Sequence, residues 1–178
     1  NLRLMKKFIH LSIALAGFLS SEVLCGQELN IMSFNIRYNT VHDSLNAWPL
    51  RKDKVISQVL FHQTHVLAVQ EALQDQVADL ENGLKNYHYT GSGRDDGKTK
   101  GEYAAIFYDS TLLILLGSSQ FWLSLTPEIP GSKSWDAAIT RIVNWAKFSH
   151  KISGKVFFVF NTHFDHLGKL ERKESAVL

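Results

Sequence analysis

Residues 156–166 read Val-Phe-Phe-Val-Phe-Asn-Thr-His-Phe-Asp-His. The first five side chains are apolar on both alternating faces, which predicts a strand that is central in its sheet and covered on both sides. His163, Asp165 and His166 follow at the carboxyl end of this strand. Ligand sites in layered α/β proteins gather where strands end and loops diverge, so these three residues are candidate site residues.

The segments around this strand alternate between helical and extended patterns. Residues 140–148 form a predicted hairpin with residues 156–162 around Ser153-Gly154. Further strands are predicted at 29–36, 65–69, 87–90, 103–108 and 112–116, and helices at 49–62, 73–83 and 167–178. A glycine-rich, charged loop occupies residues 91–101. This order favours one mixed α/β domain in which sheet packs on sheet and helices lie outside.

Two earlier strands also end in polar residues. Asn35 lies at the end of the first predicted strand, and Glu71 follows the strand at 65–69. Alone, each residue has a simpler reading, because asparagine is common in turns and glutamate is usually solvated. Together with His163 they offer the oxygen ligands and neutral imidazole that magnesium-assisted hydrolysis requires.

The first 27 residues have the layout of a secretory signal peptide. Met5-Lys6-Lys7 precedes an apolar run over residues 8–19 and then small and polar residues up to Gly26. The run is shorter than the roughly 20 apolar residues that span a bilayer, so we expect an exported protein, periplasmic or extracellular, with no transmembrane segment after signal removal. The alternatives are a buried or anchoring N-terminal helix, and a lipid anchor at Cys25. Cys25 is the only cysteine, which excludes a disulfide within the chain.

Charge argues against a broad nucleic-acid surface. The whole chain has a formal net charge of +2, and residues 1–27 hold three basic and one acidic residue. The remainder is therefore close to neutral, which disfavours extended binding to a nucleic-acid backbone but leaves short oligonucleotides open. We expect the intact protein to be a monomer.

An ordered series of motifs is the most specific feature of the sequence. It comprises Met-Ser-Phe-Asn-Ile-Arg at 32–37, Val-Gln-Glu at 69–71, Gly-Glu-Tyr-Ala-Ala-Ile-Phe-Tyr at 101–108 and Asn-Thr-His-Phe-Asp-His at 161–166. This series resembles the endonuclease/exonuclease/phosphatase superfamily, whose fold is that of DNase I, and in particular a bacterial exported branch. The resemblance runs from about residue 29 to residue 178. It implies a four-layer α-β-β-α sandwich and a phosphoester hydrolase in which water attacks phosphorus in line.

The same resemblance implies roles for individual residues. Glu71 would bind Mg²⁺ or Mn²⁺ directly, and Asn35 would hold the metal or its water shell. His163 and Asp165 are the implied catalytic residues, with His163 donating to the scissile phosphate. The candidate phosphate-binding or substrate-binding residues are Arg37, Tyr103, Arg141 and His166. For Arg141, a structural ion pair with Asp136 is an equal alternative.

The sequence lacks two segments of the superfamily pattern. No Gly-Asp-x-Asn segment and no Ser-Asp-His segment occurs, and these would supply the general base and the closing histidine. We therefore expect residues 28–178 to be the N-terminal portion of a truncated domain, with an incomplete sandwich and no activity alone. The alternative is a non-catalytic binding module made from the first half of the fold. In both cases the expected partner is a phosphate ester whose alcohol part the sequence does not specify.

Overall fold

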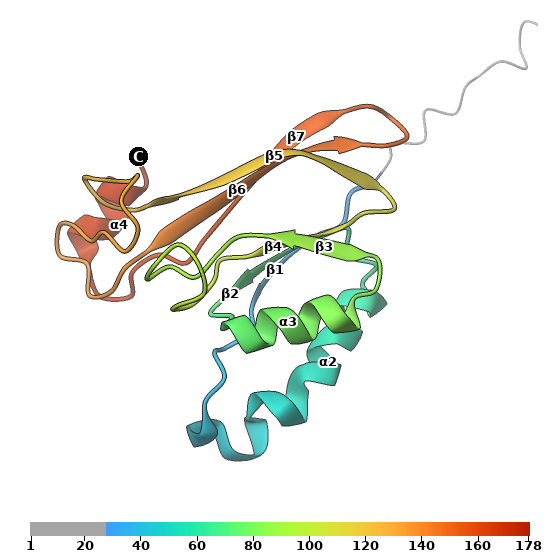
Figure 1. Cartoon of the computed structure of the whole chain (residues 1–178), viewed down its shortest axis with the longest axis horizontal. Helices are drawn as coiled ribbons and strands as arrows, with labels where there is room; N and C mark the ends of the chain where they lie inside the picture. Colours follow the sequence, from blue (N-terminus) through green and yellow to red (C-terminus); the bar gives the residue numbers. More distant parts are fainter. Residues whose placement is uncertain (1–27) are drawn as a thin grey trace, which may run out of the picture.

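The computed structural model describes residues 28–178, which form two facing β-sheets with two helices beside the first sheet and a short C-terminal helix at one end (Figure 1). The first sheet contains β1 (Ile31–Asn35), β2 (Val66–Gln70), β3 (Tyr87–Thr90) and β4 (Ile106–Asp109), in the order β1-β2-β4-β3. β1 and β2 are parallel, and the other pairs are antiparallel. The predicted signal peptide and Cys25 lie outside the described residues.

The second sheet is an antiparallel meander of long strands. It contains β5 (Leu113–Trp122), β6 (Ile142–His150) and β7 (Val156–Thr162), in that order. The predicted hairpin around Ser153-Gly154 is confirmed, since β6 and β7 pair directly. Gly154 has φ +67°, a left-handed conformation that glycine adopts without steric cost.

Two helices cover the outer face of the first sheet (Figure 1). They are α2 (Trp48–Phe61) and α3 (Gln74–Gly83), and the shorter elements are the 3₁₀ helix η1 (Val41–Asn46) and α4 (Lys169–Ser175). Pro49 lies in the first turn of α2, where its missing N–H leaves no helical bond unmade. Val59 of α2 and Leu80 of α3 are fully buried against the sheet. None of the helices in the described part of the chain could cross a membrane.

The two sheets pack face to face through a second apolar cluster. Val66 and Ile106 from the first sheet meet Ala146 and Phe148 of β6, and all four are buried. The predicted mixed α/β class with sheet on sheet is thereby confirmed. Three of the four expected layers are present, because no helix between residues 28 and 178 lies over the outer face of the second sheet (Figure 1).

The prediction that residues 156–162 form a central strand is wrong for the described residues. β7 lies at the edge of its sheet, and Phe158 and Phe160 are 53% and 63% exposed on the uncovered face. Only the opposite face packs on the first sheet, through residues such as Val159. An apolar run indicates that both faces of a strand favour burial. It does not indicate whether the strand or layer that would cover them belongs to residues 28–178.

The indole of Trp48 supports the start of α2 and offers a test of this packing. Trp48 is 1% exposed, and its Nε1 donates to Oδ2 of Asp79 at 2.8 Å. Trp48→Phe keeps an aromatic ring but removes this hydrogen bond and part of the buried area. We expect the free energy of unfolding to fall by about 1–2 kcal/mol, measured by urea denaturation. Trp145→Phe, on the half-buried surface of β6, is the control, and an unchanged Trp48→Phe midpoint would contradict the assigned role.

Candidate active site

Asn35 and Glu71 lie side by side at one edge of the first sheet. β1 and β2 run parallel with Asn35 opposite Gln70, so their carboxyl ends meet. The Nδ2 of Asn35 donates to Oε1 of Glu71 at 2.8 Å, and the Tyr38 N–H donates to Oε2 at 3.3 Å. Glu71 has φ +64°, a left-handed conformation that costs a residue with a side chain about 1–2 kcal/mol. Strained residues of this kind concentrate at functional sites, which agrees with the predicted role of Glu71.

A pocket lies between this edge and the end of the second sheet. Its lining residues are Glu71, Arg94, Glu102, Tyr103, Ala104, Arg141, Ile142 and His163. Four predicted site residues are therefore brought together in one pocket, and Asn35 adjoins them through its hydrogen bond to Glu71.

Buried amides fix the two sheets relative to each other below the pocket. The Nδ2 of Asn161 on β7 donates to the carbonyl oxygens of Val69 and Ala105 at 2.8 and 2.9 Å. The Nε2 of Gln70 donates to Oδ1 of Asn161 at 2.7 Å. Because Gln70 precedes Glu71 and Asn161 lies two residues before His163, this network sets the spacing of the two candidate groups.

His163 faces the pocket without a hydrogen bond at one ring nitrogen. Its Nδ1 is buried and unpartnered, and it lies 4.0 Å from Oε2 of Glu102. Burial lowers the pKa of His163, and the positive charge of Arg141 lowers it further. The imidazole is therefore neutral at pH 7 and can donate one N–H to an anionic ligand.

The lowered pKa of His163 gives a pH-dependent stability. Below pH 6.5 the unfolded chain binds a proton at this position more readily than the folded chain, so stability is lost as the pH falls. We expect His163→Gln to lose less stability than the parent between pH 7.5 and pH 5.5, measured by urea midpoints. The exposed His42→Gln serves as the control. Equal losses in the parent and in His163→Gln would contradict the burial of a neutral imidazole.

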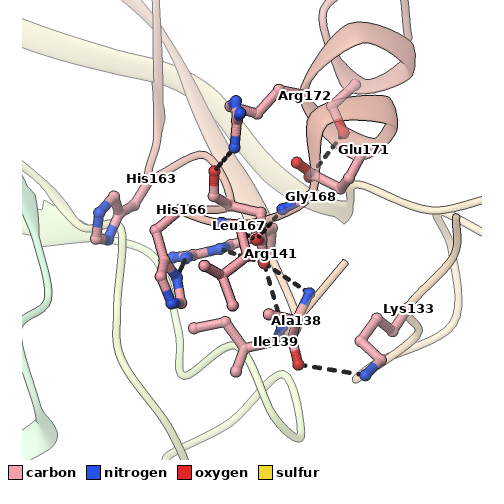
Figure 2. Close-up of polar contacts among 12 residues, drawn as sticks. Lys133, Ala138, Ile139, Arg141, His163, His166, Leu167, Gly168, Glu171 and Arg172 are labelled. Carbon is pink, nitrogen blue, oxygen red and sulfur yellow. Dashed lines mark hydrogen bonds and ion pairs between the residues drawn. The ribbon is translucent and has the colours of Figure 1, made fainter. Parts of the chain in front are cut away.

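Arg141 presents buried donors to the same pocket. Its side chain is 2% exposed, and Nε and Nη1 have no hydrogen-bond partner. Its Nη2 lies 3.3 Å from Nδ1 of His166 (Figure 2). Nε lies 3.6 Å from the Asp165 carboxylate, which supplies a countercharge, whereas Nη1 has no partner. Leaving a buried donor without a partner is costly, so this arrangement favours an anionic ligand at Nη1 of Arg141.

Asp165 lies behind Arg141 and does not line the pocket. Its Oδ1 accepts the N–H groups of Leu167 and Gly168, and Oδ2 accepts those of Ala138 and Ile139, at 2.8–3.2 Å (Figure 2). Oδ2 also lies 3.6 Å from Nε of Arg141. With both oxygens occupied by backbone donors, Asp165 holds two loops and Arg141 in place. The expected catalytic role of Asp165 requires its carboxylate to reach the pocket, and the structure does not place it there.

Three other sequence hypotheses take a different form in the structure. Arg37 is exposed and pairs with Asp43 at 3.2 Å, outside the pocket lining. His166 is exposed and contacts Arg141, without lining the pocket. The alternative pairing of Arg141 with Asp136 is wrong, because Asp136 accepts N–H groups from the first turn of α4 and Arg141 lies beside Asp165.

Arg94 and Glu102 are pocket residues that the sequence analysis missed. The Nη1 of Arg94 donates to Oε2 of Glu102 at 2.7 Å. Arg94 lies within the glycine-rich loop, and Glu102 directly follows it. The available signal was a charged loop that leads directly into the motif at 101–108. Composition alone could not show that this loop folds back over the ends of β2 and β7.

Comparisons with known proteins find similar structures and one similar sequence. No protein-family model matches the chain. A structure described as an endonuclease/exonuclease/phosphatase from Bacteroides vulgatus is 46% identical with a TM-score of 0.83, covering 84% of this chain and 57% of that chain. A mannosyl-6-phosphatase from Bacteroides thetaiotaomicron is 40% identical with a TM-score of 0.82, covering 84% and 57% respectively. An uncharacterized protein of Acanthamoeba polyphaga mimivirus is 28% identical over 146 residues, which is 77% of this chain and 54% of that protein. The chain thus spans little more than half the length of these proteins.

Proposed function

Because the chain belongs to the endonuclease/exonuclease/phosphatase superfamily, we propose that it carries part of the active site of a metal-dependent phosphoester hydrolase. The observation that carries the proposal is the pocket in which Glu71 faces the unpartnered donors of Arg141 and His163. A carboxylate beside two groups that favour an anion suits a phosphate bound next to a metal ion.

The phosphate group would occupy the side of the pocket formed by Arg141 and His163. The Arg141 guanidinium offers the buried, unpartnered Nη1, and neutral His163 offers one more donor. Donors that are fixed before the reaction stabilise charge that develops on the phosphate oxygens without needing to reorganise. Glu102, 4.0 Å from Nδ1 of His163, would set the orientation of the ring.

The metal would bind at Glu71 with Asn35 beside it. No group of three or more His, Cys, Asp or Glu residues able to hold a metal ion occurs within residues 28–178. One carboxylate with a neighbouring amide still fits Mg²⁺ or Mn²⁺, since Mg²⁺ keeps several waters and completes its shell with substrate phosphate. When bound, the cation supplies charge stabilisation to an in-line attack of water on phosphorus.

The proposed substrate class rests on a similar protein and on the net charge of the chain. The similar Bacteroides thetaiotaomicron protein is a mannosyl-6-phosphatase, which supports a small phosphate ester as substrate. A nearly neutral charge outside residues 1–27 supports the same choice over a long nucleic acid. We also propose that residues 1–27 direct export of the protein.

Phosphoester hydrolysis in the presence and absence of a chelator tests the proposal. A panel of phosphomonoesters and phosphodiesters is incubated with the intact protein and Mg²⁺, and inorganic phosphate or alcohol release is measured. We expect turnover that disappears with a chelator. The chain spans just over half the length of its relatives, so binding is also measured separately from turnover. ³¹P NMR titration with inorganic phosphate and Mg²⁺ provides this readout. Binding without turnover would favour the non-catalytic binding module. The absence of both binding and turnover would overturn both readings.

A further inference from the structure

One edge of the Arg141 guanidinium is held by two consecutive residues of the loop that follows β7. Oδ2 of Asp165 lies 3.6 Å from Nε, and Nη2 donates to Nδ1 of His166 at 3.3 Å (Figure 2). The N–H groups of Nε and Nη2 point to the same side of the planar guanidinium, so both contacts lie along one edge. Nη1 lies away from this edge and has no partner, and Arg141 lines the pocket. The plane of the guanidinium is therefore fixed from one side, and Nη1 is left for a ligand.

The contact with Arg141 determines which nitrogen of His166 carries the proton. A guanidinium donates hydrogen bonds, has no acceptor and stays protonated in proteins. Nδ1 of His166 is therefore the acceptor, and the proton of the neutral ring lies on Nε2. Asp165 supplies the countercharge of Arg141, whereas the neutral ring of His166 orients the guanidinium without offsetting its charge.

The backbone on both sides of His166 is held in place. Nη1 of Arg172 on α4 donates to the carbonyl oxygen of Asp165 at 2.8 Å, and the Leu167 N–H donates to Oδ1 of Asp165 at 2.8 Å (Figure 2). The peptide groups before and after His166 are thus both hydrogen-bonded. The ring itself is exposed and does not line the pocket. His166 can therefore act on the pocket through Arg141.

We propose that His166 is a positioning residue whose Nδ1 holds Nη2 of Arg141 and so directs Nη1 toward a bound phosphate. This role rests on the proposed function, since it takes Arg141 as part of the phosphate site. It differs from direct phosphate binding by His166, which the sequence analysis predicted. Direct binding would use the Nε2–H group, whereas positioning uses the acceptor at Nδ1.

Phosphate titrations of the full chain separate these two roles of His166. Inorganic phosphate is titrated by ³¹P NMR with Mg²⁺ at pH 7.5. His166→Ala removes the acceptor and should weaken binding about tenfold, the lower end of what a hydrogen bond to a charged group contributes. His166→Asn should restore binding, because its Oδ1 is as many bonds from Cβ as Nδ1 is. His166→Gln should bind as weakly as His166→Ala, because its Oε1 takes the place of Nε2.

A matched control and a phosphate-independent measurement complete the test. His88→Ala removes an exposed histidine of β3 outside the pocket lining and should bind phosphate as the parent does. Side-chain ¹⁵N NMR of the parent at pH 7.5 should show His166 protonated at Nε2 and not at Nδ1. Circular dichroism reports whether each variant is folded.

Several results would overturn the positioning role. They are a proton on Nδ1 of His166, parent-like binding by His166→Ala, and equal losses in His166→Ala and His166→Asn. Recovery in His166→Gln but not in His166→Asn would also overturn it, and would assign direct phosphate contact through Nε2. Failure of the proposed function looks different, because the parent itself would not bind phosphate and Arg141→Gln would change nothing. That result would overturn the role of His166 as well, while the ¹⁵N signals would still report the contact with Arg141.

Discussion

Glu71→Gln is expected to lower Mg²⁺-dependent phosphoester hydrolysis by about 1000-fold or more. The amide has nearly the same shape as the carboxylate but no charge, so it would no longer hold a divalent cation beside the phosphate. Loss of one fixed group that stabilises transition-state charge lowers turnover by about 10²–10³-fold, and loss of the cation adds to this. Turnover of the intact protein is measured on the best substrate of the panel across a range of Mg²⁺ concentrations.

The control for this change lies on the surface of α3. Glu81→Gln removes the same charge from an exposed position outside the pocket and should keep the parent rate. A second variant separates function from stability. Glu71→Gly should lose activity equally, yet unfold at the same or a higher urea concentration, because glycine relieves the left-handed φ of +64°. Parent-like rates in Glu71→Gln would remove Glu71 from the site.

The sequence was most informative where local pattern and function coincide. Asn35 ends β1, and Glu71 and His163 directly follow β2 and β7. As expected for converging strand ends, Glu71 and His163 line one pocket and Asn35 adjoins them. The β6–β7 hairpin was readable because a turn signal separates two β-rich segments. In these cases the physical cause lies within a few neighbouring residues.

The features that the sequence did not predict depend on contacts between distant segments. Residues 103–116 contain two predicted strands, yet β4 and β5 belong to different sheets. Arg94 and Glu102 reach the pocket only because their loop folds over it. The motif that contains Asp165 suggested chemistry, but its carboxylate is enclosed by N–H groups from residues 138–139, which lie more than 25 positions earlier.

Asp165→Asn is expected to lower the free energy of unfolding by about 3–5 kcal/mol, the usual result of breaking a buried ion pair from one side. The Asp165 side chain is fully buried and lies beside Arg141, whose side chain is 2% exposed. An asparagine amide would turn N–H groups toward backbone N–H groups that now donate to the carboxylate, and Arg141 would lose its countercharge. Urea denaturation at pH 7 measures the loss, and the exposed Asp53→Asn is the control.

Acid titration of the same variant distinguishes the carboxylate charge from simple packing. Burial acts to raise the pKa of Asp165, but the N–H groups of Gly168, Leu167 and Ile139, with Arg141, outweigh burial and hold it well below its ordinary value. The unfolded chain therefore takes up a proton first, near pH 3.9, so this contribution is present above that pH and is lost as the pH falls further. Asp165→Asn should flatten the stability curve of the parent below about pH 4. A loss at pH 7 with unchanged acid sensitivity would mean that shape, and not charge, holds Arg141 in place.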